Sequence, residues 1–329
     1  MLVVLAIAGP AWAGGNAGFA PPDSATESGS TINELYWIVI GVLAAVFLIV
    51  EGAILWFVFR YRRRPETAYE SEGPQIHGNT RLELLWTAIP VIILVALMVV
   101  TIVKVPSVEA RPEPGDDPLL VRVAGHQFYW EYTYENGVAS VDTLRLPVDR
   151  PVQLELVAYD VIHSWWVPAL TGKRDTIPGR VNTLSFTVNR TGVFEGQCAE
   201  LCGVQHAVMR TTVEVVPAEE FDAWLAAEAE AQSGAAAAET LGRQTWEGVC
   251  AKCHALDGGG DYGPQIAGNS TLADRAGLAT LLEQGRDDPQ VDGYMPPVSE
   301  GWPEGQIDAL IGYILSNPDL APAGAAQGG

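Results

Sequence analysis

The chain has 329 residues, which is enough for two domains or for two small domains and a membrane anchor. Its formal net charge is −21, and residues 106–329 carry −19 of it, with 13 basic and 32 acidic side chains. A field of this sign repels nucleic acid and favours basic partners, so a nucleic-acid-binding function is excluded. The alternative interpretation is a solvated surface that only aids solubility.

The N-terminal segment is typical of an exported protein. Residues 1–13 have an apolar core and end in Ala11-Trp12-Ala13, which fits a signal-peptide cleavage site, although no basic stretch precedes the core. Residues 14–30 are small and polar, and this composition predicts an extended, mobile segment.

Two long apolar runs follow, at residues 35–59 and 84–103. Each is close to the ~20 residues that cross the hydrocarbon core of a bilayer, and both are too long and apolar for a buried soluble hairpin. Basic side chains between the runs predict a cytoplasmic loop, with both ends of the chain outside, because positive charge stays inside. These are Arg60, Arg62, Arg63, Arg64 and Arg81.

One carboxylate, Glu51, lies deep in the first apolar run. An intramembrane carboxylate is costly and is expected to face protein rather than lipid. It either serves a proton route or is protonated and bonded to a neighbouring subunit, and we favour the second interpretation.

Short β-type runs occupy residues 119–134, 151–159, 181–188 and 207–216, with Pro, Gly and Asn between them. This spacing predicts an antiparallel sandwich or barrel. The segment 217–239 then predicts a short helix that runs into an Ala/Glu/Gly/Ser linker. Residues 239–317 predict a separate small domain of three helices with loops between them.

A cluster of soft ligands lies between residues 198 and 209. Cys198, Cys202, His206 and Met209 together suit copper better than zinc or calcium, and thiolates of one loop can bridge two metal ions. His163, at the end of an upstream apolar strand, can reach the same site.

Three other interpretations of this cluster stay open. A zinc site would have four Cys or His ligands and no Met. A redox-active thiol pair, as in copper-delivery proteins, would not need His206 and Met209 at these offsets, and two buried inert cysteines would be coincidence. The spacing favours copper over all three.

Two long segments, HSWWVPALTGKRDTIPGR at 163–180 and GQCAELCGVQHAVM at 196–209, closely resemble subunit II of cytochrome c oxidase. The resemblance spans residues 30–225 and implies a cupredoxin-like β-sandwich with a mixed-valence dinuclear copper centre (CuA) that moves one electron at a time. The implied copper ligands are His163, Cys198, the backbone carbonyl of Glu200, Cys202, His206 and Met209.

The resemblance implies two further roles. The Glu200 side chain would contact a magnesium ion shared with subunit I, and Glu83 matches a carboxylate at the mouth of a proton channel in subunit I. One position departs from the family, which has Gln-Trp-Tyr-Trp where this chain has Gln127-Phe128-Tyr129-Trp130. The missing tryptophan is where a soluble cytochrome c hands over its electron, so we expect the docking surface to lie elsewhere and Phe128 to be dispensable.

The motif Cys250-Ala-Lys-Cys253-His254 is typical of covalently bound haem c, with both thiols on the haem vinyl groups and His254 as an axial ligand. A thiol pair or half a zinc site would be the alternative. A thioether is expected as the second axial ligand. Of the four methionines, Met295 is the candidate, since Met98 lies in a membrane run and Met209 in the copper motif.

The segment around the haem motif resembles a small class I cytochrome c, in which Gly263-Pro264 matches the loop that supports the haem histidine. Its last helix, residues 304–315, would pack on its first helix.

The sequence therefore predicts a multidomain membrane protein. Its expected parts are a signal peptide and mobile segment (1–30), a two-helix transmembrane hairpin (31–105), a cupredoxin-like copper domain (106–225), a linker (226–238) and an all-α cytochrome c domain (239–329).

The expected function is that of the subunit through which electrons enter a proton-pumping cytochrome c oxidase. Electrons would run from an external donor (a cytochrome c or a quinol:cytochrome c reductase complex) to haem c, then to copper, then to subunit I, which holds the oxygen-reducing site. Subunits I and III are the expected partners, and the expected location is the bacterial plasma membrane with both redox domains on the periplasmic side.

The alternative function is that of the copper-centre subunit of a nitric oxide reductase. A nitrous oxide reductase would need a further large domain, and a copper-delivery factor would not need a haem or Met209. Of the remaining histidines, His126 is expected to be structural and His77 to lie in the cytoplasmic loop.

Overall fold

The computed structural model describes residues 20–62, 75, 77–109, 117–233, 235–287, 294–302 and 305–321. The predicted signal peptide (1–13), Arg63 and Arg64 lie outside these ranges. The described chain forms two compact units. One is Ser30–Val108, and the other joins the segment before Ser30 to the chain from Glu109 onward.

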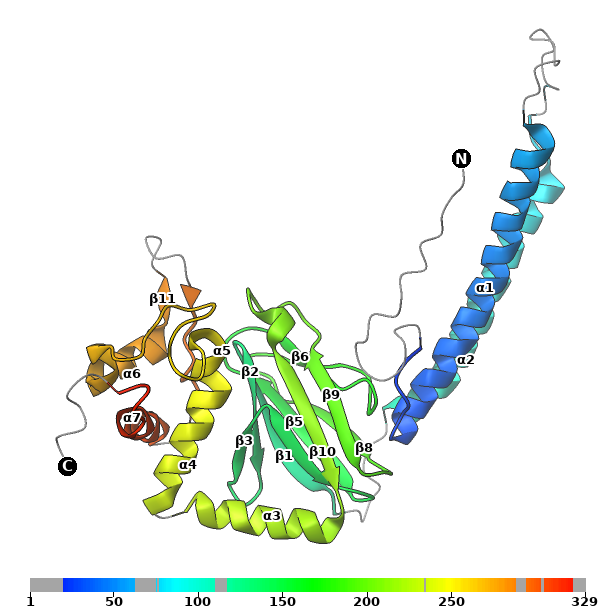
Figure 1. Ribbon diagram of the computed structural model, residues 1–329. Coiled ribbons are helices and arrows are strands. Elements are labelled where there is room, and N and C mark those ends of the chain that lie inside the picture. Colours follow the sequence, from blue (N-terminus) through cyan, green and yellow to red (C-terminus); the bar gives the residue numbers. More distant parts are fainter. Residues whose placement is uncertain are drawn as a thin grey trace. The chain divides into compact units, whose positions relative to one another are not determined.

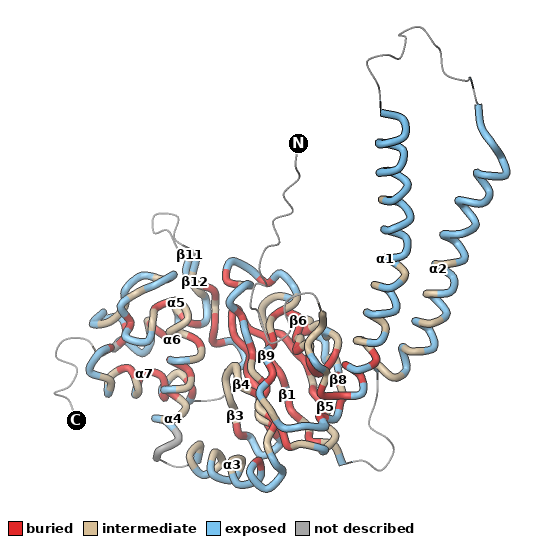
Figure 2. Tube along the Cα trace, turned by 45° about the vertical axis from the view of Figure 1, so that its right-hand side comes forward, coloured by how far each residue is buried: buried red, intermediate tan, exposed pale blue. Residues whose placement is uncertain are grey.

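The first unit is a pair of long helices, α1 (Glu27–Tyr61) and α2 (Thr80–Val108). They contain both predicted apolar runs, and both are long and apolar enough to cross a membrane. Their apolar side chains are exposed along nearly the whole length, as Figure 2 shows in pale blue. A large apolar surface is unfavourable in water, so lipid or a partner subunit must cover it.

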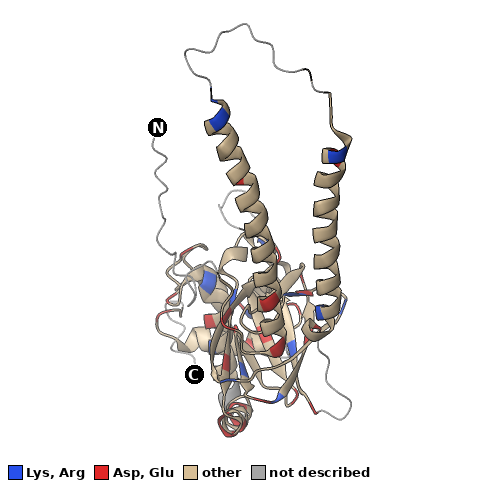
Figure 3. Ribbon diagram, turned by 90° about the vertical axis from the view of Figure 1, so that its right-hand side faces the viewer, with Lys and Arg blue, Asp and Glu red and all other residues tan. Residues whose placement is uncertain are grey.

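The two helices are antiparallel, since Lys104 near the end of α2 pairs with Glu34 near the start of α1 at 2.6 Å. Basic side chains gather at the loop ends of both helices (Figure 3), where Arg60 lies in the last turn of α1. Asn79 accepts a hydrogen bond from the Leu82 amide, and Glu83 accepts one from the Asn79 amide at 3.0 Å. These contacts fix the start of α2.

The second unit contains a β-sandwich of two five-stranded sheets (Figure 1). The first sheet has the order β3-β2-β1-β5-β8 and the second β4-β10-β9-β6-β7. The strands are β1 (Leu119–His126), β2 (Tyr129–Tyr134), β3 (Ala139–Val141), β4 (Thr143–Pro147), β5 (Pro151–Ala158), β6 (His163–Trp166), β7 (Arg174–Thr176), β8 (Asn182–Thr187), β9 (Gly192–Cys198) and β10 (Arg210–Val216).

The predicted sandwich is present, but it is not purely antiparallel. β1 pairs with β5, and β10 with β4, in parallel. The predicted strand 119–134 is in fact a hairpin, in which His126 pairs with Tyr129 around the two-residue turn Gln127-Phe128. This turn has no Gly or Asn, so local sequence gave no signal for it.

Alternation along the strands builds the core. In β1 the side chains of Leu119, Val121 and Val123 are buried, and in the paired strand β2 Trp130 and Tyr132 are buried on the same face of the sheet. Each such side chain stabilises the fold by about 1.5–3 kcal/mol through removal of its apolar surface from water. The strands therefore form a rigid support for the loops at their ends.

Residues before α1 are packed rather than mobile, contrary to the expectation for 14–30 over its described part. The Ala25 amide donates to the Ala169 carbonyl at 2.8 Å, and the Asn189 amide donates to the Ala25 carbonyl at 2.9 Å. Thr26 adds a side-chain bond to the Leu170 carbonyl. These contacts to the sandwich satisfy backbone groups that a mobile segment would leave to water.

The predicted linker 226–238 is largely helical. Helix α3 (Ala218–Ala231) packs Phe221 into the sandwich core, and α4 (Ala235–Thr245) begins soon after it. The Gln232 side chain, between them, makes two 2.8 Å hydrogen bonds to the backbone of Ala139 in β3. Ala and Glu favour helix more than coil, which explains why the predicted short helix extends to Ala231 and a second helix begins at Ala235.

The predicted helical domain is confirmed, and we call its described part from α4 onward the α domain. Its elements after α4 are a π-helical turn (Trp246–Cys250), α5 (Ala251–His254), a 3-10 turn (Ser270–Ala273), α6 (Arg275–Gln284), the short pair β11 (Arg286–Asp287) and β12 (Tyr294–Met295), and α7 (Gln306–Ser316). The last helix packs on the first, because a Cβ added at Gly242 would lie 2.1 Å from the Ala309 carbonyl oxygen.

Candidate metal centre and haem cavity

The candidate copper ligands come from the ends of adjacent strands. His163 opens β6, Cys198 closes β9, and Trp165 of β6 pairs with Cys198. His206 begins the 3-10 turn His206–Val208, and Met209 follows it directly before β10. One loop between two paired strands therefore carries most of the donors.

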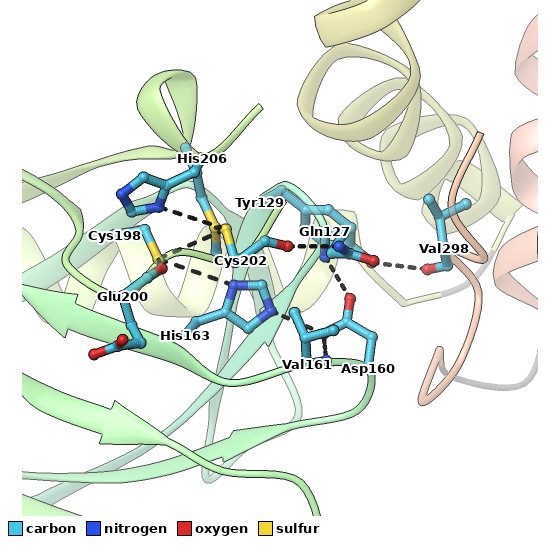
Figure 4. A network of polar contacts seen from close by, with 11 residues as sticks. Gln127, Tyr129, Asp160, Val161, His163, Cys198, Glu200, Cys202, His206 and Val298 are labelled. Atoms are coloured by element: carbon cyan, nitrogen blue, oxygen red, sulfur yellow. Dashed lines mark hydrogen bonds and ion pairs between the residues drawn. The ribbon is translucent and has the colours of Figure 1, made fainter. Parts of the chain in front are cut away.

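These donors converge in one cluster, as Figure 4 shows for the labelled residues. Cys198 Sγ lies 3.9 Å from Cys202 Sγ, 4.0 Å from His163 Nδ1 and 3.2 Å from the Glu200 carbonyl oxygen. Cys202 Sγ lies 3.6 Å from His206 Nδ1 and 3.8 Å from the Met209 sulfur. All six predicted donors are thus linked through the two thiols.

The cluster suits a soft metal. Both cysteines are free and buried, and the donor atoms of His163, Cys198 and Cys202 lie within 4.8 Å of one another. The Cys202 thiol and the His163 imidazole hold the pKa of Cys198 well below its ordinary value, although burial opposes this. A thiolate is the form that binds metal, and two thiolates with imidazole and thioether favour copper.

A carboxylate behind His163 fixes the orientation of its ring. Asp160 Oδ1 lies 2.8 Å from His163 Nε2, and the His163 side chain is fully buried. Nδ1 is therefore directed at the thiols, as expected for a metal-binding histidine whose other ring nitrogen bonds to a carboxylate. The second carboxylate oxygen of Asp160 accepts the Gln127 amide at 2.5 Å.

A cavity of about 390 Å³ in the α domain brings the haem-motif residues together. Cys250, Cys253, His254 and Met295 all line it, with an otherwise mainly apolar wall. His254 Nδ1 donates to the Pro264 carbonyl at 2.8 Å, which leaves Nε2 for an iron atom. A Cβ at Gly263 would lie 2.7 Å from His254 Cε1, so only glycine allows this support.

The residues present therefore fit a covalent haem. Two free thiols, an oriented imidazole and a thioether face one apolar space, which is the donor set of a c-type haem with His and Met ligands. The loop Gly263-Pro264 supports the histidine as its resemblance to class I cytochromes c implied.

Phe128 lies close to this cavity. Its side chain is 5% exposed and lines the cavity together with Gln127. A Cβ added at Gly203, in the loop of residues 198–209 that carries most of the copper donors (the copper loop), would lie 3.0 Å from the Phe128 ring. The aromatic position therefore stands between the haem cavity and the copper loop.

The remaining predicted residues have structural partners. The Glu200 side chain is half exposed and pairs with Lys173 at 3.3 Å. His126 is buried and stacked between Tyr129 and Tyr159, with ring centroids at 4.6 and 5.2 Å. Burial lowers the pKa of His126 to about 4, which keeps the ring neutral.

Sequence reasoning missed Gln127, Gln205 and Lys252, which join the haem cavity to the sandwich. Gln205 stands beside a predicted copper ligand and Lys252 lies inside the haem motif, so position alone could have flagged both.

Comparisons with known proteins identify the family of the chain. The transmembrane domain of cytochrome c oxidase subunit II matches residues 14–103, and the periplasmic domain of that subunit matches residues 137–216. Cytochrome c oxidase subunit 2 of Alkalihalophilus pseudofirmus is 38% identical over 292 residues, which are 84% of this chain and 84% of that protein. The chain belongs to the cytochrome c oxidase subunit II family.

Other similarities extend this result. Cytochrome c oxidase subunit 2 of Synechocystis is 33% identical over 67% of this chain and 79% of that protein. Residues 237–314 match the family of cytochrome c oxidase, cbb3-type, subunit III. The periplasmic domain of subunit II of the oxidase of Bradyrhizobium japonicum is 32% identical, covers 36% of this chain and 99% of that chain, and has a TM-score of 0.35.

As a subunit II with an added cytochrome domain, the chain is a membrane protein with two spans and part of an oxidoreductase. It is the subunit through which electrons enter the oxidase, and its two domain families imply copper and haem c as cofactors. The named relatives favour the oxidase over the nitric oxide reductase alternative.

Proposed function

We propose that this chain takes electrons from an external donor into the α domain and passes them through its copper domain to subunit I. There, oxygen is reduced to water and protons are pumped. The observation that supports this proposal is that one compact unit contains both a six-donor soft-metal cluster and a haem cavity.

At the first site, Cys250 and Cys253 would hold haem c covalently, and His254 and Met295 would be its axial ligands. When bound, the haem accepts and donates one electron. The chain's own residues prepare the site. Pro264 orients the imidazole, and the apolar wall keeps water from the thioether side.

At the second site, His163, Cys198, the Glu200 carbonyl, Cys202, His206 and Met209 would hold two copper ions. When bound, the copper pair shares one transferable electron between its ions. The strands β6, β9 and β10 hold the donors in place, so little reorganisation would accompany a change of charge. Low reorganisation favours rapid electron transfer.

The orientation and partners extend the proposal. The basic loop between α1 and α2 would face the cytoplasm, so that both redox domains lie on the periplasmic side of a bacterial plasma membrane. Subunits I and III would cover the exposed apolar faces of the two helices. The donor would be a cytochrome c or a quinol:cytochrome c reductase complex, since an acidic surface attracts basic partners.

Two carboxylates are proposed at the contact with subunit I. The Glu200 side chain would release Lys173 to contact a shared magnesium ion, since it is half exposed. Glu83 would stand at the mouth of a proton channel while it also caps α2. The domain boundaries 1–30, 31–105, 106–225, 226–238 and 239–329 complete the proposal.

Cofactor analysis of the purified oxidase tests this function. We expect haem to remain on the 35.2 kDa band after denaturing electrophoresis, and a mixed-valence copper signal in electron paramagnetic resonance. Cys250→Ala with Cys253→Ala should remove the haem and keep the copper signal, and Cys202→Ser should do the reverse. A haem-free wild-type band, or a copper signal that survives Cys202→Ser, would refute the assignment.

A further inference from the structure

The haem cavity is not closed by the α domain alone. The turn Gln127-Phe128 and Gln205, all from the β-sandwich, line it beside Cys250 and Cys253. The copper domain therefore supplies part of the wall of the cavity that is proposed to hold the haem.

The turn is tied to the copper loop as well. Gln127 Nε2 donates to the Cys202 carbonyl at 2.6 Å, and the Gln127 amide donates to Asp160, which also holds the His163 ring (Figure 4). Hydrogen bonds thus connect the cavity wall to Cys202, a predicted copper ligand, and to Asp160, which orients the predicted ligand His163.

Lys252 of the haem motif contacts the β-sandwich at two points, an ion pair with Asp142 and a hydrogen bond to the same turn. Lys252 Nζ pairs with Asp142 Oδ2 and donates to the Phe128 carbonyl at 3.0 Å. The side chains of Lys252 and Asp142 are only 19% and 25% exposed. An ion pair this shielded is screened by salt much less than an exposed one.

The sandwich side of this ion pair is rigid. Asp142 Oδ1 accepts the Trp130 amide at 2.9 Å, and the Asp142 amide donates to the Trp130 carbonyl at 2.8 Å. Asp142 also has a left-handed backbone conformation, with φ at 58°, between β3 and β4. The position of the Asp142 carboxylate is therefore fixed by contacts that do not involve Lys252.

A second contact flanks the first. Tyr129, next to the turn, is buried within the hydrophobic core of the α domain. Its hydroxyl donates to the Val298 carbonyl at 3.1 Å and accepts the Trp302 indole N–H at 2.6 Å. Burial of a sandwich tyrosine in the core of the other domain requires the two domains to stay together.

We propose that Lys252 and Asp142 are positioning residues, whose ion pair holds the haem cavity against Gln127 and Phe128 so that the α domain is a fixed donor rather than a mobile one. This inference rests on the proposed function. The haem centre would lose one electron and the copper centre would gain one across this wall, with no proton or atom transferred. The face around Phe128 is then closed to any external donor, which must reach another face of the α domain.

Two measurements on the full oxidase complex test this proposal. Hydrogen–deuterium exchange reports whether residues 126–132 and 298–302 are protected, and flash-induced reduction of the haem reports its rate of reoxidation by copper. Lys252→Met should accelerate exchange in both segments and slow reoxidation by about tenfold or more, because it leaves a buried carboxylate unpaired. It should also make reoxidation dependent on ionic strength.

Matched variants separate positioning from general damage. Lys252→Arg keeps the charge and should restore protection and rate to near wild type. Arg243→Met breaks an exposed ion pair with Glu247 in the same domain, at 3.4 Å, and should change neither measurement. If Lys252→Met hinders haem attachment, Asp142→Asn removes the pair from the other side and should give the same two effects.

The outcomes distinguish this inference from the proposed function. Unchanged exchange and rate in Lys252→Met and Asp142→Asn, with both cofactors present, would overturn the positioning role alone. A wild-type complex without haem on this chain would overturn the proposed function and this inference with it.

Discussion

At the scale of single residues, burial controls the ionisation of Glu131 in the middle of β2. The side chain is 7% exposed, and its burial raises the pKa of Glu131 to about 7, which Arg122 opposes only in part. In the unfolded chain the same carboxyl titrates near its ordinary value of 4.5. Between pH 4.5 and about pH 7, the folded sandwich therefore keeps a proton on Glu131 that the unfolded chain has lost.

The sign of the resulting pH dependence follows from proton linkage. Stability from Glu131 is fully present below pH 4.5 and is lost as the pH rises to about 7, a change of about 3 kcal/mol in the free energy of unfolding. We expect Glu131→Gln to remove this part of the pH dependence. Urea unfolding of wild type and variant at pH 5 and pH 8 measures it. The same change in the free energy of unfolding between the two pH values in both proteins would contradict the role of Glu131.

Individual donors could be predicted where a motif keeps them close in sequence. Cys198, Cys202 and Met209 belong to one loop, and the structure brings them together as expected. The contacts of Gln127 and Lys252 could not be predicted, because they join residues 75 and 124 positions apart. Neither strand alternation nor the haem motif encodes which surfaces of two domains meet.

At the scale of elements, the close crossing of α4 and α7 depends on Gly242. A Cβ there would lie 2.1 Å from the Ala309 carbonyl oxygen and 2.7 Å from Tyr313 Cβ, so the helices would have to separate. Gly312, on α7, has nothing within 4 Å of its added Cβ and is exposed. The two glycines thus form a matched pair.

We expect opposite effects from alanine at these two positions. Gly242→Ala should destabilise the α domain by about 1–3 kcal/mol through overpacking. Gly312→Ala should be neutral or stabilise it by up to about 1 kcal/mol through helix propensity. Thermal unfolding of the full chain, followed by haem absorbance, compares them; equal midpoints for both variants would show that the crossing is not tight.

Element prediction succeeded where the periodic signal was long and failed at connections. The terminal helix and both apolar runs were predicted, since many residues support each of them. The hairpin turn at Gln127-Phe128 was missed, whereas the short helix after the sandwich was predicted and is followed by a second helix that begins at Ala235. The turn lacks turn-forming residues, and the Ala-rich stretch before residue 239 folds as helix because its helix propensity is high.

At the scale of the whole molecule, the described part of the second unit places the two candidate cofactor sites next to each other. The haem cavity is shared between the α domain and the copper domain, and the copper loop lies directly behind the shared wall. The fold class and the cofactors were predictable from two motifs and the apolar runs. The fixed contact between domains was not, because it depends on the tertiary positions of Tyr129 and Asp142.

The most direct test of the central claim, that electrons pass from haem c to copper on this chain, is reoxidation of photoreduced haem c in the purified oxidase. In wild type we expect haem c to be reoxidised as copper is reduced, in equal amounts and at equal rates. In Cys202→Ser, which removes one of the two clustered thiols, haem c should stay reduced on the same timescale. Reoxidation in Cys202→Ser as fast as in wild type would contradict the relay.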